Sequence, residues 1–167
     1  KGVGMIHPNM ATMLCFITTD ADVDQSFLQS VLSESVAVSF NMTDVDGDQS
    51  TNDSVIVLAN GASGTEQIQG NSAGADSFVE AIRYVCTELA KELARDGEGA
   101  QRLIEVTVEG AHTIEDARKA AREIASSSLV KAMVHGKDPN WGRLVMALGK
   151  SSIQLEEQKI DIFISDI

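Results

Sequence analysis

Apolar and polar positions follow two different periods along the chain, which predicts strands mixed with helices. Two short apolar runs, at 13–17 and 54–59, are bounded by turn residues and have the length of buried strands. A third segment, 103–108, alternates apolar with polar residues, as a strand with one wet face does. The predicted strands span residues 13–17, 54–59, 103–108, 129–134 and 160–164.

Between these runs, apolar residues recur every three or four positions, the spacing of an amphipathic helix. Thr113 and Asp116 resemble a capping box at the start of one such segment. The polar segment 41–53 is interpreted as a structured loop, and the Gly- and Ser-rich segment 61–74 as an exposed one. The predicted helices span residues 22–40, 72–95, 113–124 and 140–148. This alternation is compatible with a doubly wound parallel sheet and with other layered α/β folds.

Length and composition fit one globular domain over residues 1–167, with 43% hydrophobic and 23% charged residues. The net charge of -12 argues against binding to nucleic acids or to anionic membranes, which need a basic patch, and leaves room for a cationic ligand. No apolar run approaches the roughly 20 residues needed to cross a bilayer. Cys15 and Cys86 resemble buried small hydrophobic residues, so we expect a reducing, cytoplasmic location.

No metal site is predicted. The acidic segment 44–48 carries oxygen ligands at alternate positions, as calcium loops do. An EF-hand loop, however, needs glycine at its sixth position and glutamate at its twelfth, and here those places hold Gln49 and Val55. We therefore expect a tight acidic turn whose Asp and Asn side chains bind the backbone of the turn itself. The histidines have no zinc-ligand spacing and lie at His7, His112 and His135.

The junction between Ala11 and Thr12 lies where a loop containing Gly and Pro enters the first strand. A threonine hydroxyl can act as a nucleophile when a base is adjacent. A break before Thr12 would supply that base, because the new α-amino group has a pKa of about 8. The alternative is that Thr12 is an ordinary β-branched residue at a strand start. His7 is a weaker candidate for the base.

Short sequence blocks are distributed along nearly the whole chain. They are KGVGMI at 1–6, PNMATML at 8–14, SFN at 39–41, DGD at 46–48, STND at 50–53, LANG at 58–61, DGEGA at 96–100 and DPNWGR at 138–143. In sequence and in order, these blocks resemble the ornithine acetyltransferase family, whose members often also act as N-acetylglutamate synthases in arginine biosynthesis. We therefore expect the central part of a longer protein, with 1–11 ending a first chain and 12–167 beginning a second.

The resemblance implies an α/β (α+β) fold in which helices cover two stacked sheets, similar to N-terminal-nucleophile hydrolases. It implies self-cleavage between Ala11 and Thr12, followed by acetyl transfer from N-acetylornithine to glutamate through an acetyl-threonine. Lys1 and Glu98 match family residues at the substrate, with Glu98 on the amino end of ornithine. By itself, Glu98 would be read as a solvated charge between two glycines. The acidic segment 44–53 is implied to shape the active-site wall.

The resemblance further implies a hetero-tetramer of two cleaved chains and no cofactor, with acetyl-CoA as an alternative donor in some members. The oxyanion donors are expected before Lys1, so this chain alone is expected to be inactive. Two alternatives stay open. A related N-terminal-nucleophile aminopeptidase would pass the acyl group to water, and a non-catalytic acidic assembly domain would show neither cleavage at residue 12 nor an acetyl adduct.

Overall fold

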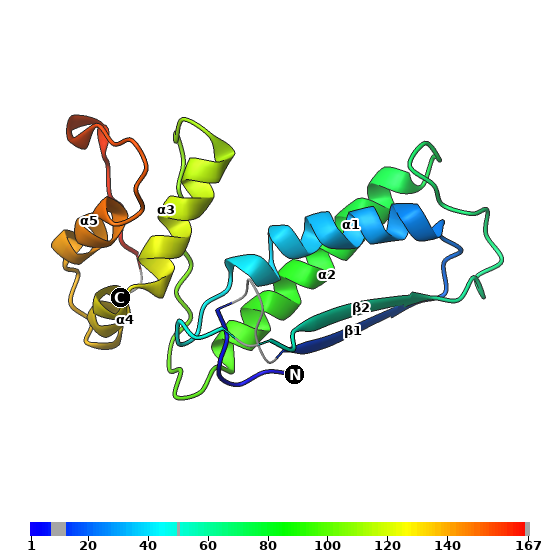
Figure 1. Ribbon diagram of the computed structural model, residues 1–167, viewed down its shortest axis with the longest axis horizontal. Helices are drawn as coiled ribbons and strands as arrows, with labels where there is room; N and C mark the ends of the chain where they lie inside the picture. The colour runs from blue at the N-terminus through cyan, green and yellow to red at the C-terminus, as the bar shows by residue number, and fades with distance from the viewer. Residues whose placement is uncertain (8–12, 50, 166–167) are drawn as a thin grey trace. The chain divides into compact units, whose positions relative to one another are not determined.

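The computed structural model describes residues 1–7, 13–49 and 51–165. Internal contacts divide the chain into two compact units, Lys1–Glu98 and Gly99–Ile167. Each unit has its own elements (Figure 1). Within the described residues, no helix is both long enough and apolar enough to span a membrane.

The first unit is a two-stranded parallel sheet packed against two helices. Strand β1 (Leu14–Thr19) pairs with β2 (Ser54–Ala59), and the chain crosses between them through helix α1 (Gln25–Ala37). Helix α2 (Ala75–Arg95) contacts α1, and both lie along the same side of the sheet (Figure 1). A short 3-10 helix, η1 (Phe40–Met42), follows α1 and contacts both helices.

The core of this unit forms between the sheet and the helices because β1 alternates. Cys15 and Ile17 point inward and are buried, whereas Phe16 between them is 62% exposed. Burial, and then the neighbouring thiol of Cys15, raise the pKa of Cys86 to about 11, so Cys86 stays a neutral thiol. The buried core residues are Met13, Cys15, Ile17, Val31, Phe40, Phe78, Ile82, Cys86 and Ala90.

The outer face of the sheet is also apolar. It carries Leu14 and Phe16 from β1, with Ile56 and Leu58 from β2, and each is more than one-third exposed. In the parallel register, Leu14 lies opposite Ser54 and Phe16 opposite Ile56. This outer face has the apolar character of a surface that another layer covers.

The second unit is helical. Helices α3 (Ile114–Ser126), α4 (Ser128–His135) and α5 (Trp141–Gly149) contact one another, and a 3-10 helix, η2 (Glu157–Lys159), follows. A small core of Val130, Met133 and Ala147 joins the helices, with Ile124, Val134 and Leu144 packed around it. As the capping-box pattern predicts, the Thr113 side chain accepts a hydrogen bond from the Asp116 N–H at 3.1 Å.

The first two predicted strands and the four predicted helices are present; β2 has the predicted ends, and the ends of the other elements are shifted by up to three residues. The strand predicted at 129–134 is wrong, because this segment lies in helix α4. Ser127 caps the helix by accepting from the Val130 N–H, and Val130 and Met133 are buried three residues apart on one face. Segments 103–108 and 160–164 form no strand within the described residues.

Helix α2 should contribute strongly to stability through its buried face. Ile82 is 5% exposed within the core, so Ile82→Ala leaves a cavity and should lower the free energy of unfolding by about 2–5 kcal/mol. Arg83→Ala, on the exposed face of the same helix turn, is the matched control. Chemical denaturation of the full-length protein measures both changes, and equal effects would contradict the assigned core.

Candidate functional site

The segment before the predicted cleavage junction is held by main-chain hydrogen bonds. The Lys1 carbonyl accepts from the Leu14 N–H at 2.9 Å, and the Lys1 nitrogen donates to the Leu14 carbonyl at 2.7 Å. Further along, the Val3 carbonyl accepts from the Glu98 N–H at 2.6 Å. This short segment therefore contacts both the start of β1 and the turn that follows α2.

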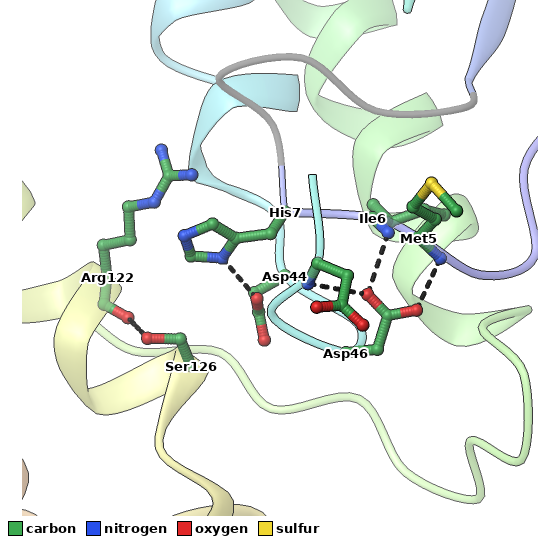
Figure 2. A network of polar contacts seen from close by, with 8 residues as sticks. Met5, Ile6, His7, Asp44, Asp46, Arg122 and Ser126 are labelled. Carbon is green, nitrogen blue, oxygen red and sulfur yellow. Dashed lines mark hydrogen bonds and ion pairs between the residues drawn. The ribbon is translucent and has the colours of Figure 1, made fainter. Parts of the chain in front are cut away.

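An acidic turn holds the same segment from a second side. Asp46 accepts hydrogen bonds from the N–H groups of Met5 at 2.5 Å and Ile6 at 3.0 Å, and from its own loop at Asp48 at 3.1 Å (Figure 2). The Ile6 carbonyl in turn accepts from the Val45 N–H at 2.6 Å. Partial burial opposes ionisation of Asp46, but the N–H donors outweigh it and hold the pKa of this carboxyl below its usual value.

Asp44 binds the end of the same segment. Its Oδ1 lies 2.5 Å from His7 Nδ1, and the Asp44 side chain is 1% exposed (Figure 2). The carboxylate oxygens of this turn thus bind protein donors. The bond from the Asp48 N–H to Asp46 lies within the turn, as predicted, whereas the contacts with segment 1–7 were not predicted. No group of three or more metal-binding side chains is arranged around a common point in the part of the chain that the structure describes.

The first residue after the junction that the structure describes, Met13, is fixed by a side chain. Its N–H donates to Asp53 Oδ1, and its carbonyl accepts from the Ser54 N–H at 2.9 Å. Asp53 therefore extends the β1–β2 ladder by one rung. Its second oxygen, Oδ2, is buried and has no hydrogen-bond partner among the described residues.

A cavity of about 270 Å³ lies beside this rung. Polar side chains from α1 and η1 line it together with Asp53, so it is partly hydrophilic. The described lining residues are Met13, Gln29, Leu32, Ser33, Val36, Phe40, Asn41, Asp53, Ser54 and Val55.

Glu98 is exposed on a tight turn immediately after α2. Gly97 is buried, and a Cβ there would lie 2.9 Å from Val45 Cγ1, so this position has no room for a side chain. Gly99 has a φ of +73°, a conformation that favours glycine. The two glycines thus allow the helix to end closely against the acidic turn, while the intervening Glu98 remains exposed.

Of the predicted site residues, Ala11 and Thr12 lie outside the described residues, whereas Lys1 and Glu98 lie within them. Lys1 pairs with Leu14, two positions after Thr12, while the Glu98 main chain pairs with Val3, so both contact the segment 1–7 or the start of β1. Sequence reasoning gave no individual role to Asp46 or Asp53. For Asp46, the signals were the predicted acidic turn and a family-like block; for Asp53, the signal was its position in a family-like block before a strand.

Comparison with known proteins gives consistent matches. A sequence model of the ArgJ family matches residues 1–167. The chain is 56% identical over 167 residues to the arginine biosynthesis bifunctional protein ArgJ of Symbiobacterium thermophilum, covering 100% of this chain and 42% of that protein. It is 54% identical over 166 residues to the protein of the same name from Dehalococcoides mccartyi, and this match covers 99% of this chain and 41% of that protein. The chain thus spans about two fifths of these relatives' length.

A solved structure shows the same fold. The crystal structure of the arginine biosynthesis bifunctional protein from Bacillus halodurans superposes with a TM-score of 0.86 at 44% sequence identity. The match covers 87% of this chain and 68% of that chain. The predicted α/β class is confirmed by this likeness and by the mixture of helices and strands.

The hydrogen bonds to Asp46 should make the N-terminal segment acid-sensitive. Because the folded pKa is lowered, the stabilisation is present above the unfolded pKa of about 3.9 and is lost as the pH falls through the folded value. Hydrogen exchange of the Met5 and Ile6 amides in the full-length protein, corrected for intrinsic rates, should show protection at pH 7 that disappears in acid.

Asp46→Asn should weaken that protection at pH 7 and flatten its pH dependence. Asp48→Asn, which changes an exposed carboxylate in the same turn, is the control and should behave as the wild type does. Protection that persists unchanged from pH 7 into acid in the wild type would rule out the proposed role of the Asp46 charge.

Proposed function

Because this chain belongs to the ArgJ family, we propose that the complete protein transfers an acetyl group from N-acetylornithine to glutamate in arginine biosynthesis. The observation that carries this proposal is the match to curated relatives with that pathway in their name over the full length of the chain. The proposal concerns the whole protein, of which this chain corresponds to about two fifths.

In this proposal, Thr12 is the nucleophile. Its hydroxyl first attacks the Ala11 carbonyl, which moves the Ala11 acyl group from the Thr12 nitrogen to the Thr12 oxygen as an ester. Water then hydrolyses this ester, so that Ala11 ends in a carboxylate and Thr12 has a free α-amino group and a free hydroxyl. That amino group then accepts the hydroxyl proton as Thr12 attacks the acetyl carbonyl of N-acetylornithine. The amine of ornithine leaves with the proton, and the amine of glutamate attacks the acetyl-threonine to regenerate the hydroxyl.

The hydrogen bonds around Met13 support this role. A nucleophile must be held in a narrow range of positions to react quickly. Met13 is the residue bonded to Thr12. Its N–H donates to Asp53 and its carbonyl accepts from the Ser54 N–H, so the main chain of Met13 is held as a rung at the start of the sheet. We infer that this rung fixes the main chain immediately after the junction.

Lys1 and Glu98 are proposed to bind the substrate. Glu98 is an exposed carboxylate on an anchored turn, and a carboxylate suits the side-chain ammonium of ornithine. The net charge of -12 also favours a cationic substrate. No cofactor is required by this chemistry, although acetyl-CoA is proposed as an alternative acetyl donor.

The proposed assembly contains the chain that precedes the junction together with the chain that begins at Thr12, as a cytoplasmic hetero-tetramer. The apolar outer face of the sheet supports contact with a further layer of protein. Intact mass of the full-length protein, with and without N-acetylornithine, tests cleavage and the acetyl-enzyme together. An intact chain with no adduct would contradict the proposal.

Replacing the nucleophile should stop both reactions. Thr12→Ala removes the hydroxyl used for cleavage and for transfer, so both should be abolished, whereas Thr12→Ser should keep part of each. Gel analysis detects the two chains, and an assay of ornithine release detects transfer. If the alanine variant still splits at residue 12, Thr12 is not the processing nucleophile.

Replacing the proposed ammonium ligand should affect substrate use alone. Loss of a charged hydrogen-bond partner costs about 1.5–3 kcal/mol, so Glu98→Gln should lower kcat/KM for N-acetylornithine by about 10- to 100-fold. Cleavage between Ala11 and Thr12 should remain. Glu80→Gln, on an exposed position of α2, is the control. Equal loss of cleavage would instead assign Glu98 to the fold or to processing.

A further inference from the structure

The carboxylate of Glu98 lies over the main chain of Gly4. A Cβ placed on Gly4 would be 2.9 Å from Glu98 Oε2 and 3.9 Å from Glu98 Cβ. Carbon and oxygen atoms that are not bonded do not approach this closely, so a methyl group on Gly4 and the present position of the carboxylate are incompatible. Gly4 does not have a positive φ, so the close approach, and not the backbone conformation, is what requires glycine.

The main chain on either side of Gly4 is fixed. The Val3 carbonyl accepts the Glu98 N–H at 2.6 Å, and the Met5 N–H donates to Asp46 at 2.5 Å. The clash with an added methyl group would therefore be relieved mainly by movement of the Glu98 side chain, which is exposed. A methyl group on Gly4 should therefore lower the free energy of unfolding only slightly, but it should displace the Glu98 carboxylate.

The carboxylate of Asp46 also lies near Gly4, but it leaves room for a methyl group there. Asp46 Oδ2 would lie 3.5 Å from the same Cβ, an ordinary van der Waals distance. A methyl group on Gly4 would thus move Glu98 while leaving the hydrogen bonds of Asp46 in place. Within the described residues, Gly4 therefore leaves open the space that the Glu98 carboxylate occupies, and a methyl group there would displace this carboxylate.

We propose that Gly4 is a positioning residue: because it has no side chain, the Glu98 carboxylate can occupy the position in which it meets the side-chain ammonium of the acetyl donor. Gly4 then contributes to the preference for a cationic donor without touching it. This inference rests on the proposed function, and specifically on the proposed role of Glu98.

The test compares two donors in the full-length enzyme. N-acetylornithine carries the side-chain ammonium, and N-acetylnorvaline has the same carbon chain without it. Gly4→Ala should lower the ratio of kcat/KM for the two donors by about 10- to 100-fold, because a shift of ~1 Å can cost that much. The effect should appear mainly in KM for N-acetylornithine. Cleavage at residue 12 and the Tm should be retained.

Two further variants assign the effect to Glu98. Adding Gly4→Ala to Glu98→Gln should not lower the ratio of kcat/KM for the two donors any further, since both changes remove the same interaction. Combining Gly4→Ala with Glu98→Asp shortens the carboxylate and should recover part of the ratio. Gly149→Ala is the control, because a Cβ at Gly149 meets no atom within 4 Å.

The outcomes separate this inference from the proposed function. If Glu98→Gln lowers the donor ratio and Gly4→Ala does not, the inference about Gly4 is overturned alone. If Glu98→Gln leaves the ratio unchanged, the proposed role of Glu98 fails, and the inference fails with it. If Gly4→Ala does not fold, with or without Glu98→Asp, the methyl group clashes with the main chain, which also overturns the inference.

Discussion

The structure of the first unit depends on aspartate side chains that accept main-chain N–H groups. Asp46 binds Met5 and Ile6, and Asp53 binds Met13, each across about 40 positions of sequence. A segment without regular secondary structure would otherwise leave these donors for water. The two carboxylates therefore fix the main chain on both sides of the undescribed residues 8–12.

The sheet and helices of the first unit were predictable because their signals are local. The 54–59 run has the predicted ends as a strand, and the stripe on α2 has the period of a buried helix face. The run at 129–134 was misjudged because apolar residues in a short segment fit either period. Burial of Val130 and Met133, set by contacts with α5, decided in favour of a helix.

The candidate site was less accessible from sequence alone. Resemblance to a family singled out Lys1 and Glu98, but no local pattern joins either residue to the segment around it. Contacts such as Asp46 with Met5 link distant positions through a carboxylate whose type is common on any surface. Gly4 illustrates the same limit. The reason that this position lacks a side chain is the nearby Glu98 Oε2, and only the structure shows that atom beside it.

The proposed cleavage would change which chains the hydrogen bonds of segment 1–7 connect. Contacts now made within one chain, such as Ile6 with Val45 and Lys1 with Leu14, would become contacts between two chains. The new ends would begin at a high effective concentration, because the segment is already docked before the bond breaks. Backbone cleavage would then create a heteromeric interface without any diffusional search, and dissociation of the two chains would require several bonds to open together.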